Sequence, residues 1–169
     1  VVSMGPPQAD VALREALAMG CDDALLISDR AFGGADTWAT SSTIAAALKK
    51  LDYDVIITGR QAIDGDTAQV GPQVKTPCLL TALAELADPR YMSVHGVFDA
   101  YREKEVKVWG LEDIKDTVNE GNIGLKGSPT RVKKSFTKQA KGAGTILNDL
   151  SDDEAVAAIV EKLQEKHII

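Results

Sequence analysis

Short apolar runs alternate with amphipathic segments through the first half of the chain, and this alternation restricts the possible folds more than any other feature. The apolar runs Val1–Met4, Ala24–Ile27 and Val55–Thr58 are predicted to be strands. The third run has no polar residue before Thr58, so we expect that strand to be buried on both faces. Strands alternating with helices at this spacing favour an α/β fold, with an open, mainly parallel sheet and helices on both of its faces.

Local signals mark where the helices begin and end. Pro7 suits the first turn of a helix, and Gly20 can end that helix in the left-handed conformation. Asp36 or Thr37 can cap a second helix, which is predicted to run through Lys50.

The second half of the chain is less regular, and one junction in it is abrupt. A helix that begins at Thr67 meets Pro77 within a few residues, where a new helical pattern starts. We therefore expect the chain to omit residues before Val1 and between Val74 and Lys75. The later elements are predicted as a helix over 79–87, an irregular stretch over 88–98, a strand over 106–109 and a helix from 151.

A basic stretch without acidic residues runs from Gly121 to Asn148, within a chain whose formal net charge is −6. A solvated connection and a strip facing an acidic partner or a phosphate are both open interpretations, and the partner is favoured. Its six basic residues are Lys126, Arg131, Lys133, Lys134, Lys138 and Lys141.

The C-terminal helix should begin at Ser151, because Ser151 and Glu154 have the spacing of a capping box. Its apolar stripe must pack either on its own domain or on another chain. We favour a partner subunit, because the glycine-containing connection gives the helix reach. The predicted organisation is an α/β domain over 1–136 followed by a linker and helical arm over 137–169. The stripe consists of Val156, Ile159, Val160 and Leu163.

Composition excludes several classes of protein. The negative net charge argues against general affinity for nucleic acid. The longest apolar runs are far shorter than the roughly 20 residues that span a bilayer, and no signal peptide is visible, so we expect a soluble, cytoplasmic protein without a membrane span. Cys21 and Cys78 have no metal-ligand spacing, which predicts reduced thiols and no metal site.

The residues with most chemical content follow the third predicted strand, in the run TGRQAIDGDTAQVGP over 58–72. Ligands of open parallel sheets bind outside the carboxyl ends of the strands, where this run lies. Gly59 and Gly65 permit close backbone approach, and the amides of 66–70 can hold a phosphate at a helix start. A plain turn with Asp66 as a helix cap is the alternative, because neither a Walker lysine nor a GxGxxG pattern is present.

This run, together with VSMGP at 2–6, ALAMG at 16–20 and PRY at 89–91, resembles the β subunit of electron transfer flavoprotein. The resemblance implies an adenine-nucleotide α-hydrolase-like fold and a heterodimer with an α subunit that carries FAD. Ordinary members of that family hold AMP in the β subunit, whereas an electron-bifurcating group holds a second FAD there. The run over 58–72 is similar to the bifurcating group.

The resemblance also implies which residues contact the nucleotide. The side chains at Val2 and Met4 should line the adenine pocket, and Ala62 with the backbone of 66–70 should bind the ribose and phosphates. No catalytic residue is predicted, because the flavin carries the redox chemistry. The full set of expected cofactor-binding residues is Val2, Ser3, Met4, Thr58, Gly59, Gln61, Ala62, Asp66, Thr67, Ala68, Gln69, Val70, Gly71 and Pro72.

A docking loop is implied over 88–98, with Arg90, Tyr91 and the apolar anchor Val94 expected to contact an acyl-CoA dehydrogenase. The alternative is an internal loop, with Val94, Val97 and Phe98 folded into the core. The implied function is hydride acceptance from NADH by the β-subunit FAD, with electrons passed to ferredoxin or flavodoxin and, through the α-subunit FAD, to the dehydrogenase. An ordinary AMP-holding subunit and a stand-alone adenine-nucleotide-binding regulatory protein are the alternatives.

Overall fold

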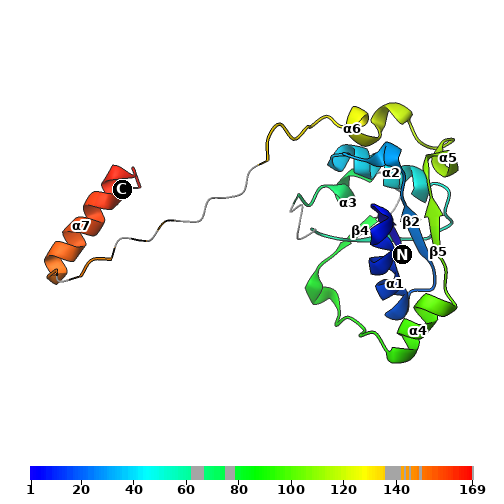
Figure 1. Ribbon diagram of the computed structural model, residues 1–169, viewed down its shortest axis with the longest axis horizontal. Coiled ribbons are helices and arrows are strands. Elements are labelled where there is room, and N and C mark those ends of the chain that lie inside the picture. The colour runs from blue at the N-terminus through cyan, green and yellow to red at the C-terminus, as the bar shows by residue number, and fades with distance from the viewer. Residues whose placement is uncertain are drawn as a thin grey trace. The chain divides into compact units, whose positions relative to one another are not determined.

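A computed structural model describes residues 1–61, 67–74, 79–135, 142, 144, 146–148 and 150–168 of the chain. The chain forms two compact units, Val1–Val132 and Lys133–Ile169. The first unit holds both sheets, and the second contains helix α7 (Asp152–Glu165) (Figure 1).

The main sheet of the first unit has three parallel strands in the order β1 (Val2–Met4), β2 (Ala24–Ile27) and β5 (Val106–Trp109). All four residues of the central strand β2 are buried, because helices cover both faces of the sheet at this strand. Side chains alternate along a strand. Accordingly, Ala24 and Leu26 belong to one hydrophobic cluster, and Leu25 and Ile27 belong to another.

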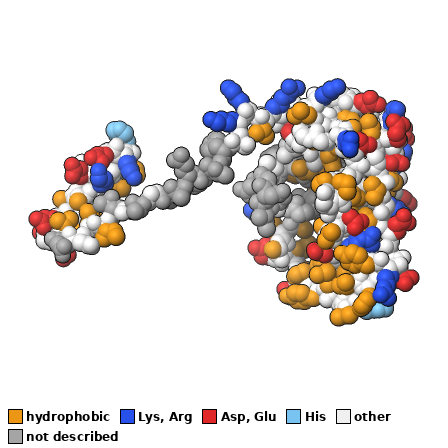
Figure 2. Space-filling view, in the orientation of Figure 1, with side chains coloured by type: hydrophobic (Ala, Val, Ile, Leu, Met, Phe, Trp, Pro, Cys, Tyr) orange, Lys and Arg blue, Asp and Glu red, His pale blue; other side chains and the backbone are white. Residues whose placement is uncertain are grey.

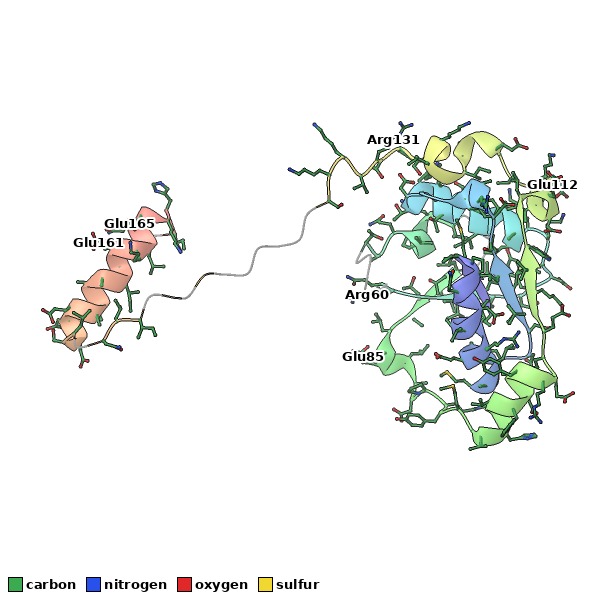
Figure 3. The ribbon with its side chains drawn as sticks, viewed as in Figure 1. Arg60, Glu85, Glu112, Arg131, Glu161 and Glu165 are labelled. Atoms are coloured by element: carbon green, nitrogen blue, oxygen red, sulfur yellow. The ribbon has the colours of Figure 1, made fainter. Side chains whose placement is uncertain are left out.

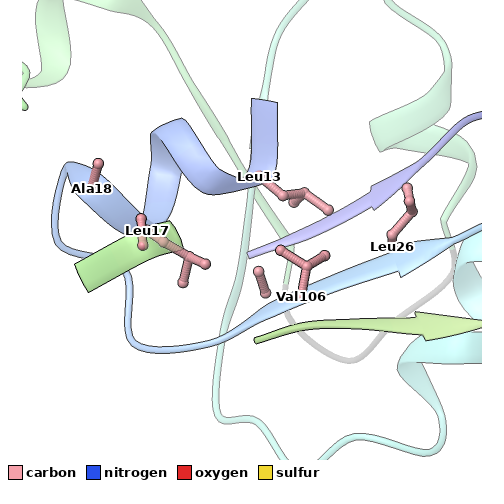
Figure 4. Packing of buried hydrophobic residues seen from close by; sticks show 7 residues of the cluster. Leu13, Leu17, Ala18, Leu26 and Val106 are labelled. Carbon is pink, nitrogen blue, oxygen red and sulfur yellow. The ribbon is translucent and has the colours of Figure 1, made fainter. Parts of the chain in front are cut away.

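Helices α1 (Asp10–Ala18) and α4 (Val94–Arg102) cover one face of this sheet. Figure 4 shows α1 residues packing toward β2 and β5 in this cluster. The two helices are close at Gly96, where an added β-carbon would collide with the carbonyl oxygen of Ala18. Arg14 of α1 also donates a hydrogen bond to the carbonyl of Ala100 in α4, which fastens the pair.

The opposite face is covered by α2 (Thr37–Leu48), with α5 (Leu111–Ile114) and α6 (Gly124–Gly127) beside it. The predicted arrangement of an open parallel sheet with helices on both faces is therefore confirmed. Buried residues of this second cluster are Leu25, Ile27, Phe32, Ala46, Ala47, Ile114 and Ile123.

The predicted helix signals are confirmed. Pro7 opens a 3₁₀ turn, η1 (Pro7–Ala9), that leads into α1, and Gly20 follows that helix with φ of +112°. The carboxylate of Asp36 caps α2 by accepting a hydrogen bond of 3.0 Å from the backbone N–H of Ala39. At α7, the backbone N–H of Ser151 donates to Glu154 over 2.9 Å.

A second sheet contains β3 (Ile56–Gly59) and β4 (Leu79–Ala82), which are parallel and paired from Ile56 with Leu79 to Gly59 with Ala82. The predicted helix over 79–87 is therefore wrong, since its first residues form a strand and only a 3₁₀ turn, η3 (Ala84–Leu86), follows. Burial of the third strand on both faces is also wrong. Its Ile57 is 65% exposed, because β3 has a single neighbouring strand among the described residues.

The segment over 88–98 is not irregular throughout, because α4 begins at Val94. Gly96 inside this helix and Pro89 before it obscured the helical pattern. Ser93 marks the start of this helix in the sequence, because serine is a preferred N-cap residue. Its side chain accepts a hydrogen bond of 2.9 Å from the N–H of Gly96. The remaining short elements are α3 (Val70–Gln73), η2 (Arg30–Phe32) and η4 (Glu120–Asn122).

Candidate cofactor site

A cavity of about 920 Å³ lies along β3 in the first unit. One wall is the whole of β3 with the turn that leads into α3, and another is formed by the amino-terminal residues of β1 and β2. Ile44 and Leu48 of α2, with Leu51 after it, contribute apolar surface, as does Trp109 at the end of β5. A cavity of this size with mostly apolar walls suits an aromatic ring system carrying a few polar groups.

Most of the predicted cofactor-binding residues meet in this cavity. Residues Ser3 and Pro72 do not line it, and Met4 lines a different cavity at the far end of β1. Ala62 and Asp66 lie outside the described residues. The predicted residues that line the cavity are Val2, Thr58, Gly59, Gln61, Thr67, Ala68, Gln69, Val70 and Gly71.

Two features of this wall have the character of a ligand site. The hydroxyl oxygen of Thr58 is buried and has no hydrogen-bond partner among the described residues. An unpartnered buried hydroxyl is costly, so a ligand atom that satisfies it would be favoured. Ala68 has a φ of 51°, in the left-handed region that costs a non-glycine residue about 1–2 kcal/mol. Such strain concentrates where a loop is shaped for function.

The helix dipole at the predicted phosphate site, the start of α3, is weaker than the sequence suggested. A longer helix was expected from Thr67, but α3 is one turn over Val70–Gln73, so its dipole is small. Positive charge is supplied instead by Arg60, which is exposed at the cavity beside Gln61, with 3.4 Å between its Nη2 and Gln61 Oε1 (Figure 3).

Sequence reasoning missed the contribution of β5. Lys107 and Trp109 line the cavity, and the Lys107 ammonium lies 3.7 Å from the carboxylate of Asp23, with both groups exposed. The sequence carried no local signal for this, because only the parallel pairing of β5 with β2 places Lys107 opposite Leu25.

The predicted docking residues lie at the start of α4 and in the segment before it. Tyr91 is 90% exposed and Val94 is 76% exposed, and Val97 and Phe98 are also exposed. The alternative that Val94, Val97 and Phe98 fold into the core is therefore wrong. Figure 2 shows hydrophobic side chains gathered over this end of the first unit. Arg90 lies over Gly20, where an added β-carbon would be 2.6 Å from the Arg90 guanidinium.

Within the described residues, no helix is long and apolar enough to cross a membrane. The same residues contain no group of three or more potential ligands that could hold a metal ion. Cys21 is a half-buried free thiol, whereas Cys78 lies outside the described residues, as do Lys138 and Lys141 of the basic stretch.

The open parallel sheet with helices on both faces places the first unit in the α/β class, and the cavity along β3 is its candidate ligand site. Comparison with known proteins narrows this class. The family model described as "Electron transfer flavoprotein domain" matches residues 1–76. The chain belongs to the electron transfer flavoprotein family, and its relatives include β subunits over its whole length.

Three relatives show the extent of the similarity. The electron transfer flavoprotein subunit beta of Clostridium acetobutylicum is 52% identical, with 100% of this chain and 78% of the relative covered. Subunit CarD of the caffeyl-CoA reductase-Etf complex of Acetobacterium woodii is 46% identical, with 100% and 78% covered. The acryloyl-CoA reductase electron transfer subunit gamma of Anaerotignum propionicum is 43% identical, with 99% and 78% covered.

The chain is also shorter than its relatives within the aligned region. The alignment with the Clostridium acetobutylicum protein spans 206 residues and includes all 169 residues of this chain, so at least 37 aligned positions have no counterpart here. An omission of this kind was expected from the abrupt junction after Val74.

Proposed function

We propose that this chain is the β subunit of a heterodimeric electron transfer flavoprotein that binds FAD and accepts a hydride from NADH. Under this proposal, one electron goes to a low-potential acceptor, ferredoxin or flavodoxin. The other goes through the α-subunit FAD to an acyl-CoA dehydrogenase. The observation that carries the proposal is that the cavity along β3 is lined by nine of the residues expected to contact the nucleotide.

The residues present fit a flavin nucleotide. Val2 and Val70 offer apolar surface to a ring system, and the Thr58 hydroxyl offers an unsatisfied hydrogen-bonding group. Gly59 leaves open space, since an added β-carbon would meet no atom within 4 Å. A pyrophosphate can approach the backbone there, with the Arg60 guanidinium nearby to balance its charge.

When bound, FAD supplies the two-electron chemistry, and the chain supplies position and electrostatics. The apolar wall from α2 excludes water from the ring system, and the turn around Ala68 presents backbone groups to the phosphates. We propose no proton-transfer residue. The alternative is that the same cavity holds AMP, as it does in the family's AMP-holding members. The subunit would then have an ordinary electron-transfer role without NADH oxidation. A stand-alone regulatory protein gains no support from the relatives.

The names of two relatives support partners related to acyl-CoA reduction, one in a caffeyl-CoA reductase-Etf complex and one with acryloyl-CoA reductase. We propose that Arg90, Tyr91 and Val94 dock the dehydrogenase.

We also propose that residues 1–136 form the nucleotide domain and that residues 137–169 form an arm. Helix α7 has no buried residue within its own unit, so its apolar stripe is available to pack on an α subunit. Such a complex would work in the cytoplasm.

An anaerobic assay of the purified heterodimer tests this function. NADH should reduce ferredoxin or flavodoxin only when the dehydrogenase and its enoyl-CoA substrate are also present, because bifurcation couples the two routes. NADH oxidation that never requires the low-potential acceptor, or no reaction with NADH at all, would contradict the proposal and favour the AMP-holding alternative.

A further inference from the structure

Two positively charged side chains lie exposed at α6 and in the segment that follows it. They belong to Lys126 and Arg131, and neither forms an ion pair or a side-chain hydrogen bond with any residue that the structure describes. Figure 3 shows Arg131 at the edge of the first unit, beside α6. Leu125 of α6 is 53% exposed and adds a small apolar area. We define Leu125, Lys126 and Arg131 as the cationic surface.

The segment that carries these cations is fixed to the fold, although it has no regular structure after α6. The buried Ser128 accepts a hydrogen bond from the N–H of Asp36 over 2.9 Å and donates one to the carbonyl of Gly124 over 2.7 Å. Thr130 donates its N–H and its hydroxyl to Asp36 Oδ2, over 2.9 Å and 2.8 Å. Because Ser128 and Thr130 lie between the two cations in the chain, the backbone of both is held in place before a partner arrives, which lowers the entropic cost of docking.

The acidic residues of neighbouring elements are engaged with other groups. The carboxylate of Asp36 accepts hydrogen bonds from backbone N–H groups and from the hydroxyl of Thr130. Glu120 of η4 acts on Lys115, whose pKa is raised by Glu112 and, to a smaller extent, by Glu120. The cationic surface therefore keeps a local positive potential on a chain whose formal net charge is −6. Other cations of the first unit do pair with carboxylates, namely Arg14, Lys50, Lys107 and Lys115.

The cationic surface lies on the opposite side of the main sheet from the proposed docking residues of α4. Helix α6 lies beside α2 on one face of the sheet, whereas α1 and α4 cover the other face. Figure 1 shows α6 and α4 at opposite ends of the first unit. Two partners can therefore bind at the same time, as a subunit that delivers electrons to two acceptors requires.

These features favour a protein with an acidic surface over other anionic partners. Lys126 and Arg131 line neither cavity, so a small phosphate ligand has no enclosed site there. Recognition of an anionic membrane typically uses clusters of about four to eight basic residues. Two exposed cations beside a small apolar area suit a brief protein contact, in which charge guides the encounter more than it prolongs the complex. An electron carrier needs such a contact, because it must leave after each transfer.

We infer that the cationic surface docks the low-potential electron carrier, a small acidic redox protein, with Lys126 and Arg131 attracting its carboxylates and Leu125 contacting the surface around its redox centre. An iron–sulfur carrier brings negative charge of its own, because its cluster is held by cysteine thiolates. The inference rests on the proposed function, which supplies the carrier, and it adds the place where that carrier binds.

The test compares Lys126→Gln and Arg131→Gln with Lys49→Gln in the purified heterodimer. Lys49 is an exposed cation just after α2 that has no ion pair among the described residues and lines neither cavity. Each cationic-surface variant should raise the Michaelis constant for ferredoxin about threefold at low ionic strength, and the two together about tenfold. The difference should disappear at about 1 M salt, where exposed charges are screened. Lys49→Gln should behave as the unaltered protein does.

The same variants should keep their flavin content, their melting temperature and their Michaelis constant for the dehydrogenase. Arg131→Lys, which keeps the charge, should retain the affinity for ferredoxin. A lowered melting temperature or a dissociated heterodimer would overturn the inference, because the cations would then hold the assembly together. A loss of affinity that does not depend on salt would also overturn it.

Direct binding of oxidised ferredoxin, measured by calorimetry at low ionic strength, needs no reaction with NADH. It tests the cationic surface even if the β subunit holds AMP and the proposed function fails. Equal affinity in the unaltered protein and in Arg131→Gln, or no binding to the unaltered protein, would overturn the inference. Unchanged ferredoxin binding together with loss of binding to phosphatidylserine vesicles would overturn it in favour of a membrane surface.

Discussion

The hydroxyl of Thr58 lies so close to Gly71 that a β-carbon built on Gly71 would be 2.8 Å from Thr58 Oγ1. Thr58 is in β3 and Gly71 is in α3, so this contact sets how closely the strand end and the short helix approach beside the cavity. A side chain at position 71 therefore moves the cavity wall itself.

Gly71→Ala should release the nucleotide of the β subunit, because the added methyl group forces β3 and α3 apart. Overpacking of this kind costs about 1–3 kcal/mol. Gly59→Ala distinguishes a moved cavity wall from a direct clash with the ligand. Its β-carbon meets no protein atom within 4 Å, so it leaves the wall in place. Any loss of nucleotide there must come from contact with the ligand itself.

Nucleotide extracted after denaturation and measured by chromatography decides both cases, with Gly142→Ala as a control outside both cavities. Full nucleotide content in Gly71→Ala and Gly59→Ala would show that the site lies elsewhere.

Acid should loosen the segment that follows α6, because that segment is tied to Asp36. Burial alone would raise the pKa of Asp36, but hydrogen bonds from the N–H of Ala39 and from the N–H and hydroxyl of Thr130 outweigh it and lower the pKa below 3.8. A lowered folded-state pKa contributes stability above the unfolded-state pKa, and this stability is lost as the pH falls through the folded value.

Asp36→Asn should lower the melting temperature at pH 7 by about 3 °C, or roughly 1 kcal/mol, because an amide nitrogen in place of Oδ2 cannot accept the two hydrogen bonds from Thr130. The difference from the unaltered protein should shrink below pH 3.8. Asp22→Asn makes the same charge change at a residue without a hydrogen bond or ion pair in the described part of the chain, and it should show no such trend. A difference that is constant from pH 7 to pH 3 would refute the role given to the Asp36 carboxylate.

Removing residues 151–169 should weaken the heterodimer more than it lowers the melting temperature of the β subunit. The apolar stripe of α7 is uncovered within its own unit, with Ile159 half exposed, so the stripe is free to pack on another body, and we propose that this body is the α subunit. Ile159→Asp should act in the same direction, whereas Glu161→Gln on the same helix should not. Size-exclusion chromatography and thermal melting measure the two effects. Intact assembly of the truncated protein would assign the helix another role.

Val94→Asp should raise the Michaelis constant for the acyl-CoA dehydrogenase about tenfold while FAD content stays unchanged. The exposed Val94 begins α4, where an acidic side chain is compatible with the helix dipole, so the fold should survive. An unpaired carboxylate facing an apolar pocket is costly to desolvate. Val132→Asp, at a residue 87% exposed, is the matched control. Equal kinetics for the two variants would move the docking surface away from α4.

The fold was predictable where periodicity and end signals agree. The stretch from Val1 through Leu48 has proline, glycine and aspartate at its helix ends, and its strands and helices were predicted correctly. Around Leu79 the apolar run is too short to separate strand from helix by pattern alone. Only pairing with β3 decides it, and that is tertiary information.

One wall of the candidate site was predictable from the sequence, but the other walls were not. The run over 58–72 indicated which backbone approaches a ligand, whereas the opposite wall comes from Ile44 and Trp109, which are remote in the chain. No local signal assigns those residues to the cavity.

The central claim is that the β subunit holds a flavin, and the most direct test is the nucleotide content of the purified heterodimer. The protein is denatured, the released nucleotides are separated by chromatography, and each is counted against protein concentration. We expect two FAD and no AMP per heterodimer. One FAD with one AMP would contradict it and identify an ordinary electron transfer flavoprotein.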